Sequence, residues 1–239
     1  RIDAAALLNG PGETILAGVP DGLDGLVLSE LARALKRPGV GLVVVARDGQ
    51  RLAWFEQALA FFAPGVETVT LPAWDCMPYD RVSPSAVVAA RRMAALAELA
   101  EPEENSRPKL LLTTVNAVAQ RVPAKAAVAA SVWSAAGGNR VDLAVLVRWL
   151  EENGFLRTAT VREPGEYAVR GGIVDLYAPG AEAPVRLDFF GDTLESIRRF
   201  DPESQRTTGQ QSRVRLVPMS EGMLGAETIR RFRQPHVAT

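Results

Sequence analysis

Short apolar runs alternate with stretches of helical periodicity over the first 120 or so residues. Two runs, Val43–Val45 and Leu110–Leu112, are continuously apolar, which is typical of strands buried on both faces of a parallel sheet. Strands that alternate with helices in this way indicate an α/β domain of right-handed βαβ units. The predicted strands are Thr14–Val19, Gly41–Ala46, Glu67–Leu71 and Lys109–Val115, and the predicted helices are Leu26–Leu35, Gln50–Phe61 and Ser85–Leu99.

The pattern changes after an Ala-rich stretch that begins at about Ala126. One amphipathic helix is predicted at Val141–Asn153, and short strands follow it. A helix beside antiparallel strands is an α+β module, distinct from the first region. Its predicted strands are Gly172–Tyr177, a hairpin of Val185–Phe190 with Thr193–Phe200, and Arg213–Pro218; Thr207–Ser212 is polar and suggests a flexible loop, and Glu227–Arg233 suggests a last helix.

Composition excludes several kinds of site. Lys plus Arg is 27 and Asp plus Glu is 28, so the overall charge gives no support to nucleic-acid binding. Arginines are locally frequent near the C-terminal end, which fits either contact with DNA or a solvated surface. Cys76 and His236 are single, so we expect no disulfide, no zinc site and no His-dependent nucleophile. We also expect no membrane span, and we interpret the chain as part of a longer cytoplasmic protein.

A glycine-rich loop follows the first predicted strand, at the position where nucleotide-binding folds carry a P-loop. A working P-loop has a Gly, a Lys and a Ser or Thr at three positions that here hold Leu23, Asp24 and Gly25, after Gly18 and Gly22. An aspartate in place of the lysine puts negative charge beside a triphosphate. We therefore expect a structural turn without a bound nucleotide.

Four segments carry a family resemblance. The first is 71–84, which contains LPAWDCMPYD and Ser83-Pro84. The others are 163–175 (EPGEYAVRGGIVD), 184–192 (PVRLDFFGD) and 195–202. They resemble the N-terminal region of the bacterial transcription-repair coupling factors. Arg170-Gly171-Gly172 and the block RLDFFGD (186–192) are also shared with the excision-repair protein UvrB. UvrB differs in two ways, because it keeps an intact P-loop and carries a DNA-threading β-hairpin. Here the chain passes from Ser83-Pro84 directly into a predicted helix, which leaves no room for that hairpin.

The resemblance implies a fold and a domain order. The expected fold class is α/β: a P-loop or RecA-like parallel-sheet domain with a degenerate nucleotide site, interrupted by an inserted α+β domain like the second domain of UvrB. Residues 1–125 would form the first domain, residues 126–216 the insertion that binds the damage sensor UvrA, and residues 217–239 the return to the first domain.

The candidate site lies on one face of the strand Val185–Phe190. If Val185, Leu187 and Phe189 face the core, the alternate residues Arg186, Asp188 and Phe190 face the other way. Strand pattern alone favours a plainer interpretation, in which Arg186 and Asp188 form an exposed ion pair and Phe190 belongs to the core. The resemblance favours contact with UvrA, and it places the contacts at Arg170, Arg186, Phe190, Glu195 and Arg198.

By the same resemblance, the region is an adaptor that recruits UvrA to RNA polymerase stalled at DNA damage. It would hydrolyse no ATP itself, because ATP, magnesium and double-stranded DNA would bind separate motor domains of the full-length protein. The protein's own C-terminal domain would mask the UvrA surface at rest. Two alternatives remain open: an active UvrB-type ATPase bound to damaged DNA, and a scaffold that only braces the motor.

Overall fold

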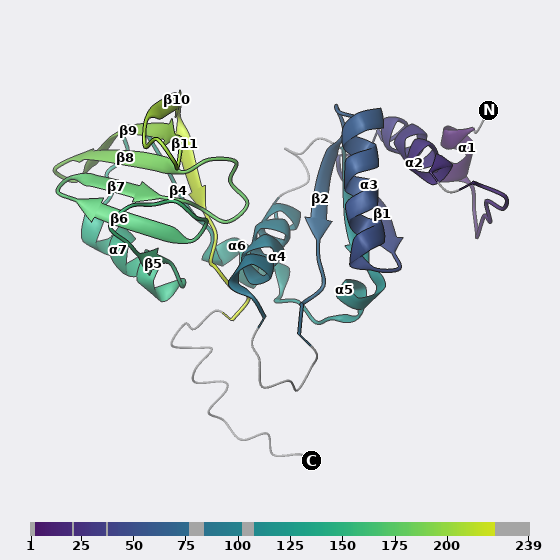
Figure 1. The fold of residues 1–239 in the computed structure, drawn as a ribbon, viewed down its shortest axis with the longest axis horizontal. Helices are drawn as coiled ribbons and strands as arrows, with labels where there is room; N and C mark the ends of the chain where they lie inside the picture. Colours follow the sequence, from purple (N-terminus) through teal and green to yellow (C-terminus); the bar gives the residue numbers. More distant parts are fainter. Residues whose placement is uncertain (1–2, 21, 37, 77–83, 102–107, 223–239) are drawn as a thin grey trace, which may run out of the picture. The chain divides into compact units, whose positions relative to one another are not determined.

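The computed structural model describes residues 3–20, 22–36, 38–76, 84–101 and 108–222. The residues up to 74 together with 98–121 form one compact unit, unit 1. The described residues of 75–97 and of 122–222 form a second, unit 2. Both units mix helices with strands, so the chain is of mixed α/β character (Figure 1).

Unit 1 is built on a small parallel sheet with the strand order β1-β3-β2. Leu110 and Leu112 of the central strand are fully buried, and α2 and α3 supply Leu28, Leu52 and Leu59 to the same core. Figure 1 shows α3 lying along the strands. The elements are β1 (Gly39–Ala46), β2 (Glu67–Leu71), β3 (Pro108–Thr114), α1 (Ala4–Asn9), α2 (Leu23–Arg33), α3 (Gly49–Phe62) and α5 (Val115–Ala119).

Three of the four strands predicted for this region are confirmed, but the strand at Thr14–Val19 is wrong. The segment pairs with no other strand among the described residues, and Ile15 has 80% of its surface exposed. Apolar character alone does not make a strand, because the backbone also needs a neighbour to complete the hydrogen-bonded ladder. The RecA-like assignment of this sheet stays a prediction.

Burial on both faces is confirmed for the central strand and wrong for β1. On the face away from α2 and α3, Val43 and Val45 of β1 are 51% and 49% exposed, whereas Lys109 and Thr113 of the central strand are 7% and 1% exposed. Strand β1 is an edge strand, and α2 and α3 pack against its other face, which carries Leu42 and Val44. A continuous apolar run therefore does not distinguish an edge strand from a central one.

Unit 2 is dominated by a six-stranded sheet with the order β10-β9-β8-β7-β6-β5. Its pairs are antiparallel except for β5 with β6, and a separate antiparallel pair joins β4 to β11. The strands are β4 (Trp133–Ala136), β5 (Leu156–Arg157), β6 (Glu166–Arg170), β7 (Ile173–Leu176), β8 (Val185–Phe190), β9 (Thr193–Phe200), β10 (Thr207–Gln211) and β11 (Arg213–Leu216), and the helices are α6 (Lys125–Ser131) and α7 (Leu143–Glu152).

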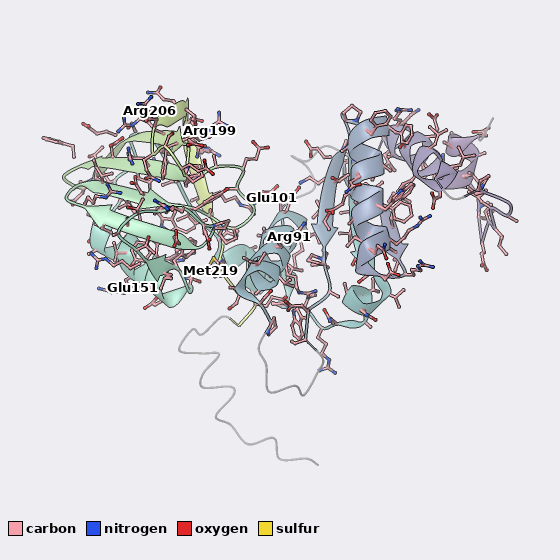
Figure 2. All side chains as sticks on the ribbon, viewed as in Figure 1. Arg91, Glu101, Glu151, Arg199, Arg206 and Met219 are labelled. Carbon is pink, nitrogen blue, oxygen red and sulfur yellow. The ribbon has the colours of Figure 1, made fainter. Side chains whose placement is uncertain are left out.

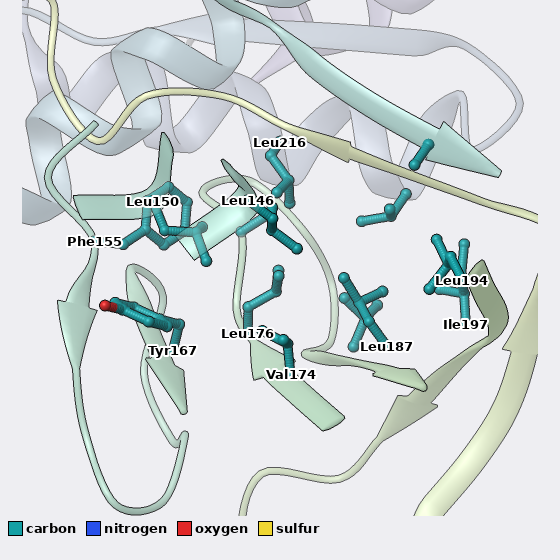
Figure 3. Close-up of a cluster of buried hydrophobic side chains, with 14 residues drawn as sticks. Leu146, Leu150, Phe155, Tyr167, Val174, Leu176, Leu187, Leu194, Ile197 and Leu216 are labelled. Atoms are coloured by element: carbon teal, nitrogen blue, oxygen red, sulfur yellow. The ribbon is translucent and has the colours of Figure 1, made fainter. Parts of the chain in front are cut away.

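The core of unit 2 joins side chains of α7 to side chains of the sheet, and Figure 3 shows Leu146 and Leu150 close to Leu176. The carboxylate of Asp142 caps α7, and Leu146 and Leu150 are fully buried against Leu176 and Leu187. Each fully buried leucine contributes about 1.5–3 kcal/mol.

Tyr167 is buried in the same core, and its hydroxyl donates to Glu151 Oε1 at 3.1 Å. The pKa of Tyr167 is raised because burial disfavours the phenolate and the Glu151 carboxylate holds the proton.

The predicted hairpin of Val185–Phe190 with Thr193–Phe200 is confirmed with the same boundaries. The flexible loop expected at Thr207–Ser212 is wrong, because Thr207–Gln211 is the edge strand β10 and pairs with β9. The side chains of this strand are polar because both of its faces lie near solvent. A loop has the same polar composition, so the sequence alone does not separate the two. The helix expected at Glu227–Arg233 lies outside the described residues.

Helix α4 (Ala86–Leu99) contributes all but its last two residues to unit 2. Arg92 is fully buried and pairs with Glu221, and Arg215 Nη2 donates to the carbonyl of Ala97 at 2.9 Å. A Cβ at Gly180 would lie 2.6 Å from Ala94 Cβ, so a glycine lets the chain pass close to this helix. In the described part of the chain, no helix has the length and apolar character needed to cross a membrane.

Candidate protein-binding face of the six-stranded sheet

The strands of unit 2 turn one set of side chains toward α7 and the alternate set away from it. On β8, Val185 and Leu187 are buried in the core, so Arg186 and Asp188 face the other way. Their neighbours across the strands continue this opposite side: Arg186 pairs in register with Asp175, and Asp188 pairs with Ile173 and Ser196. We call this side the outer face and define it as Arg170, Ile173, Asp175, Arg186, Asp188, Phe190, Ser196 and Arg198.

Asp175 is the centre of a two-arginine cluster on the outer face. Its carboxylate is 1% exposed and accepts from Arg186 twice, Nε to Oδ1 at 2.6 Å and Nη2 to Oδ2 at 2.8 Å. Arg170 Nη2 donates to the same Oδ2 at 3.2 Å. The Arg186 guanidinium also stacks over the Phe200 ring at 5.0 Å, and the hydrogen bonds to Asp175 raise the pKa of Arg186. One carboxylate therefore orients two guanidinium groups.

Asp188 orients a third arginine. Arg198 donates to it through Nη2 to Oδ1 at 2.7 Å and through Nε to Oδ2 at 2.9 Å, and the Ser196 hydroxyl donates to Oδ2. Burial alone would raise the pKa of Asp188, but the hydrogen bonds and the charges of Arg198 and Arg186 outweigh burial and lower it. The three arginines and two aspartates leave the outer face with a net charge of +1.

Phe190 stands beside this charged network with 76% of its surface exposed. The plainer interpretation, in which Phe190 is core, is therefore wrong. Ile173 is the second exposed apolar residue of the outer face, at 36%. An aromatic side chain next to fixed arginines is the composition of an interface hot spot.

Two glycines hold the end of β8 in place. Gly171 has a φ of +60°, which the tight turn between β6 and β7 requires, and a Cβ at Gly172 would lie 2.7 Å from the carbonyl oxygen of Phe189. This close approach allows the Gly172 carbonyl to accept from the Phe189 N–H at 2.7 Å. The sequence Arg170-Gly171-Gly172 thus fixes the position of Phe190 relative to Arg170.

The structure brings four of the five predicted site residues onto the outer face: Arg170, Arg186, Phe190 and Arg198. The fifth, Glu195, is exposed, and the register between β8 and β9 skips it at a β-bulge. The predicted exposed pair of Arg186 with Asp188 is not formed; each residue pairs with a partner on a neighbouring strand instead. Sequence reasoning missed Asp175 and Ile173, and the only signal for them was their alternation along the strand Gly172–Tyr177.

The glycine-rich loop of unit 1 has a different arrangement. Helix α2 begins at Leu23, after Gly22 with a φ of +98°, and Asp24 lies in its first turn. The Asp24 carboxylate pairs with Arg51 and accepts from the Gly25 N–H at 2.9 Å. A negative side chain therefore occupies one backbone donor in the first turn of α2, where an anion would otherwise be favoured.

Gly25 has a packing role. A Cβ at this position would lie 2.7 Å from both Ala58 Cβ and the Trp54 ring, so the glycine allows α2 and α3 to approach closely. A Ser or Thr, which a P-loop carries at this position to hold magnesium, would collide with α3. Among the described residues, no three His, Cys, Asp or Glu side chains are grouped as metal ligands.

Comparison with known proteins finds one matching family model and proteins similar to most of the chain. Residues 134–221 match the UvrB interaction domain. The chain is 37% identical to the transcription-repair-coupling factor of Myxococcus xanthus over 217 residues, which are 88% of this chain and 18% of that protein. The factors of Haemophilus influenzae and Escherichia coli are 31% and 30% identical over 207 and 203 residues, which are 87% and 85% of this chain and 17% of each protein.

The chain spans less than a fifth of the length of these relatives. The matched domain contains the whole outer face, from Arg170 to Arg198. The chain is therefore similar over most of its length to part of the bacterial transcription-repair-coupling factors, and its residues 134–221 match the UvrB interaction domain.

Proposed function

We propose that the outer face of unit 2 binds the excision-repair protein UvrA. The observation that carries this function is Phe190, exposed at 76% beside arginines that two aspartates hold in place, within a segment that matches the UvrB interaction domain. Preorganised arginines lose little freedom on binding, and an exposed aromatic ring supplies the apolar contact area. The net positive charge of the outer face favours an acidic partner surface.

In the longer protein, this contact would make the chain an adaptor for transcription-coupled repair. UvrA would be brought to RNA polymerase stalled at DNA damage, while separate motor domains would bind ATP, magnesium and double-stranded DNA. In this arrangement residues 126–216 are the partner-binding domain, and residues 1–125 with 217–239 are its UvrB-like scaffold. The C-terminal domain of the longer protein would cover the outer face at rest.

The scaffold would carry no nucleotide chemistry of its own. Asp24 and its pair with Arg51 support this, as does the close packing at Gly25. Calorimetric titration of the chain with ATP and magnesium should give no binding in the micromolar range. Micromolar affinity would instead favour the alternative of an active UvrB-type ATPase.

The main test is titration of purified UvrA with the chain and two variants. Phe190→Ala and Arg186→Ala should each weaken binding by about 30-fold, because loss of an interface hot spot costs about 2 kcal/mol. Phe61→Ala is the matched control, since Phe61 is a phenylalanine of unit 1 that is 79% exposed. Equal affinity of all three variants and the parent chain would contradict the proposed site, and an absence of UvrA binding by the folded parent chain would leave only the scaffold role.

A further inference from the structure

A second group of arginines lies away from the outer face, at the β10 edge of unit 2. Residues 199–215 contain four arginines and two carboxylates, a formal charge of +2 in a chain whose net charge is −1. All four arginines, at positions 199, 206, 213 and 215, are exposed. Figure 2 shows Arg199 and Arg206 at the β9–β10 end of the unit. Among the residues that the structure describes, no ion pair involves Arg199, Arg206 or Arg213.

Two of these arginines line one small pocket. Its volume is about 170 Å³, and Arg199, Gln211 and Arg215 line it together with Glu182 and alanines of the turn 178–183. That is room for about five water molecules, which suits an oxyanion group and is smaller than the pockets that hold drug-sized ligands.

The cationic groups of the pocket are positioned by their neighbours. Arg199 Nη2 lies 3.5 Å from the point where a Cβ at Gly209 would be, so its guanidinium lies across the edge strand where that strand has no side chain. Arg215 Nη2 is tied to the carbonyl of Ala97 at 2.9 Å, and Gln211 Nε2 donates to the Arg213 carbonyl at 2.8 Å. Glu182 lines the same pocket without an ion pair to Arg199, so its carboxylate opposes anion binding there.

The pocket continues into a polar edge. Among the strands that the structure describes, β10 pairs with β9 alone, and its sequence is Thr207-Thr208-Gly209-Gln210-Gln211. Hydroxyls, amides, open backbone N–H groups and arginines are the groups that contact nucleic-acid phosphates. Arg206 precedes the strand and Arg213 follows it, so cationic side chains lie along the edge. Such a row of arginines can contact successive phosphates of one nucleic-acid strand. The edge strand carries no large apolar side chain that would enter a membrane.

We propose that this edge, defined as Arg199, Arg206, Thr207–Gln211, Arg213 and Arg215, binds the phosphate backbone of a nucleic acid without reading its sequence. The pocket between Arg199 and Arg215 holds one phosphate, and the remaining arginines contact its neighbours. This function is separate from UvrA binding, because it uses a different edge of unit 2 and none of the outer-face residues.

The test is fluorescence anisotropy of the chain with a labelled 25-base-pair duplex of random sequence, between 50 and 200 mM salt. Three neutralised phosphates, one in the pocket and one each at Arg206 and Arg213, give a slope of log affinity against log salt of about −2.7, which is roughly a 40-fold loss over that range. Arg199→Ala should reduce the slope by about one, and the double variant Arg206→Ala with Arg213→Ala by about two. Glu182→Gln should raise the affinity severalfold, a gain that misfolding cannot produce.

Two exposed arginines of unit 2 serve as controls, because neither belongs to this edge. Arg140→Ala and Arg170→Ala should leave duplex binding unchanged; their side chains are 85% and 54% exposed. The proposal is overturned if the chain does not bind the duplex at 50 mM salt, if Arg140→Ala weakens binding as much as Arg199→Ala, or if Glu182→Gln fails to increase affinity. It is also overturned if inorganic phosphate shifts the NMR signals of this edge while the duplex does not.

Discussion

Unit 1 and unit 2 each contain an arginine that is paired with an aspartate and stacked on an aromatic ring. At the start of α2, Arg51 pairs with Asp24 and lies 4.6 Å from the centre of the Trp54 ring. On the outer face, Arg186 pairs with Asp175 and lies 5.0 Å from the centre of the Phe200 ring. The two sites differ in their ratio of charges.

In unit 1 one aspartate meets one arginine, so the pair is neutral and fills the N-terminal turn of a helix. In unit 2 one buried aspartate meets two arginines, and Arg170 of that cluster keeps a side chain that is 54% exposed. The extra guanidinium is oriented and remains accessible to a partner. An aspartate with one arginine therefore forms a neutral pair, whereas an aspartate with two arginines leaves one positive charge available to a partner.

The largest expected effect comes from removing the shared carboxylate. Asp175→Asn leaves Arg186 without its bidentate partner at a buried position, and breaking a buried ion pair costs about 3 kcal/mol. Urea unfolding should show this loss, and UvrA affinity should fall at least tenfold at temperatures where the variant is folded. Asp192→Asn is the control, because that carboxylate is 70% exposed and should affect neither measurement. Unchanged UvrA affinity of folded Asp175→Asn would show that the shared carboxylate does not position the arginines.

A smaller effect is expected at the helix contact of unit 1. Gly25→Ala puts a Cβ 2.7 Å from Ala58 Cβ, and the overpacking should exceed the usual gain of alanine in a helix, for a net loss of about 1–2 kcal/mol in unfolding free energy. Gly49→Ala in α3 is the matched control, since a Cβ there meets no atom within 4 Å. UvrA affinity should stay unchanged in both variants. A stabilised Gly25→Ala chain would mean that the close helix packing does not explain the glycine.

The smallest effect concerns pH. Because the pKa of Asp188 is lowered in the folded chain, its pair with Arg198 contributes stability above the ordinary aspartate pKa of about 3.9 and loses it as pH falls through the lower folded value. Both side chains are partly exposed, so we expect about 1 kcal/mol or less. Unfolding curves of the parent chain and Asp188→Asn should therefore converge between pH 5 and pH 2. Curves that stay parallel over this range would exclude the pair as a source of acid sensitivity.

The sequence predicted the elements whose patterns are local. The hairpin of β8 and β9 is an example, because its alternation of apolar and charged residues and its Gly191-Asp192 turn leave one register. The loop at Gly18–Gly25 was likewise predicted to lack a phosphate site from residue identity alone, and this stays a prediction until ATP binding is measured.

What the sequence could not predict depends on distant partners. Asp175 and Arg186 are 11 positions apart and meet only because β7 and β8 pair in one register, so Asp188 looked like the obvious partner. The packing reason for Gly25 needs Trp54 and Ala58 on another helix. The edge position of β1 and the strand character of Thr207–Gln211 depend on which strands lie beside them.

Photo-crosslinking from position 190 tests the central claim most directly. Benzoylphenylalanine placed at Phe190 should crosslink to UvrA on irradiation, and the same group placed at Phe61 should not, although the two side chains are 76% and 79% exposed. Unlabelled parent chain should compete with the crosslink. An equal yield from both positions, or crosslinking from Phe61 alone, would contradict the assignment of the outer face as the UvrA-binding surface.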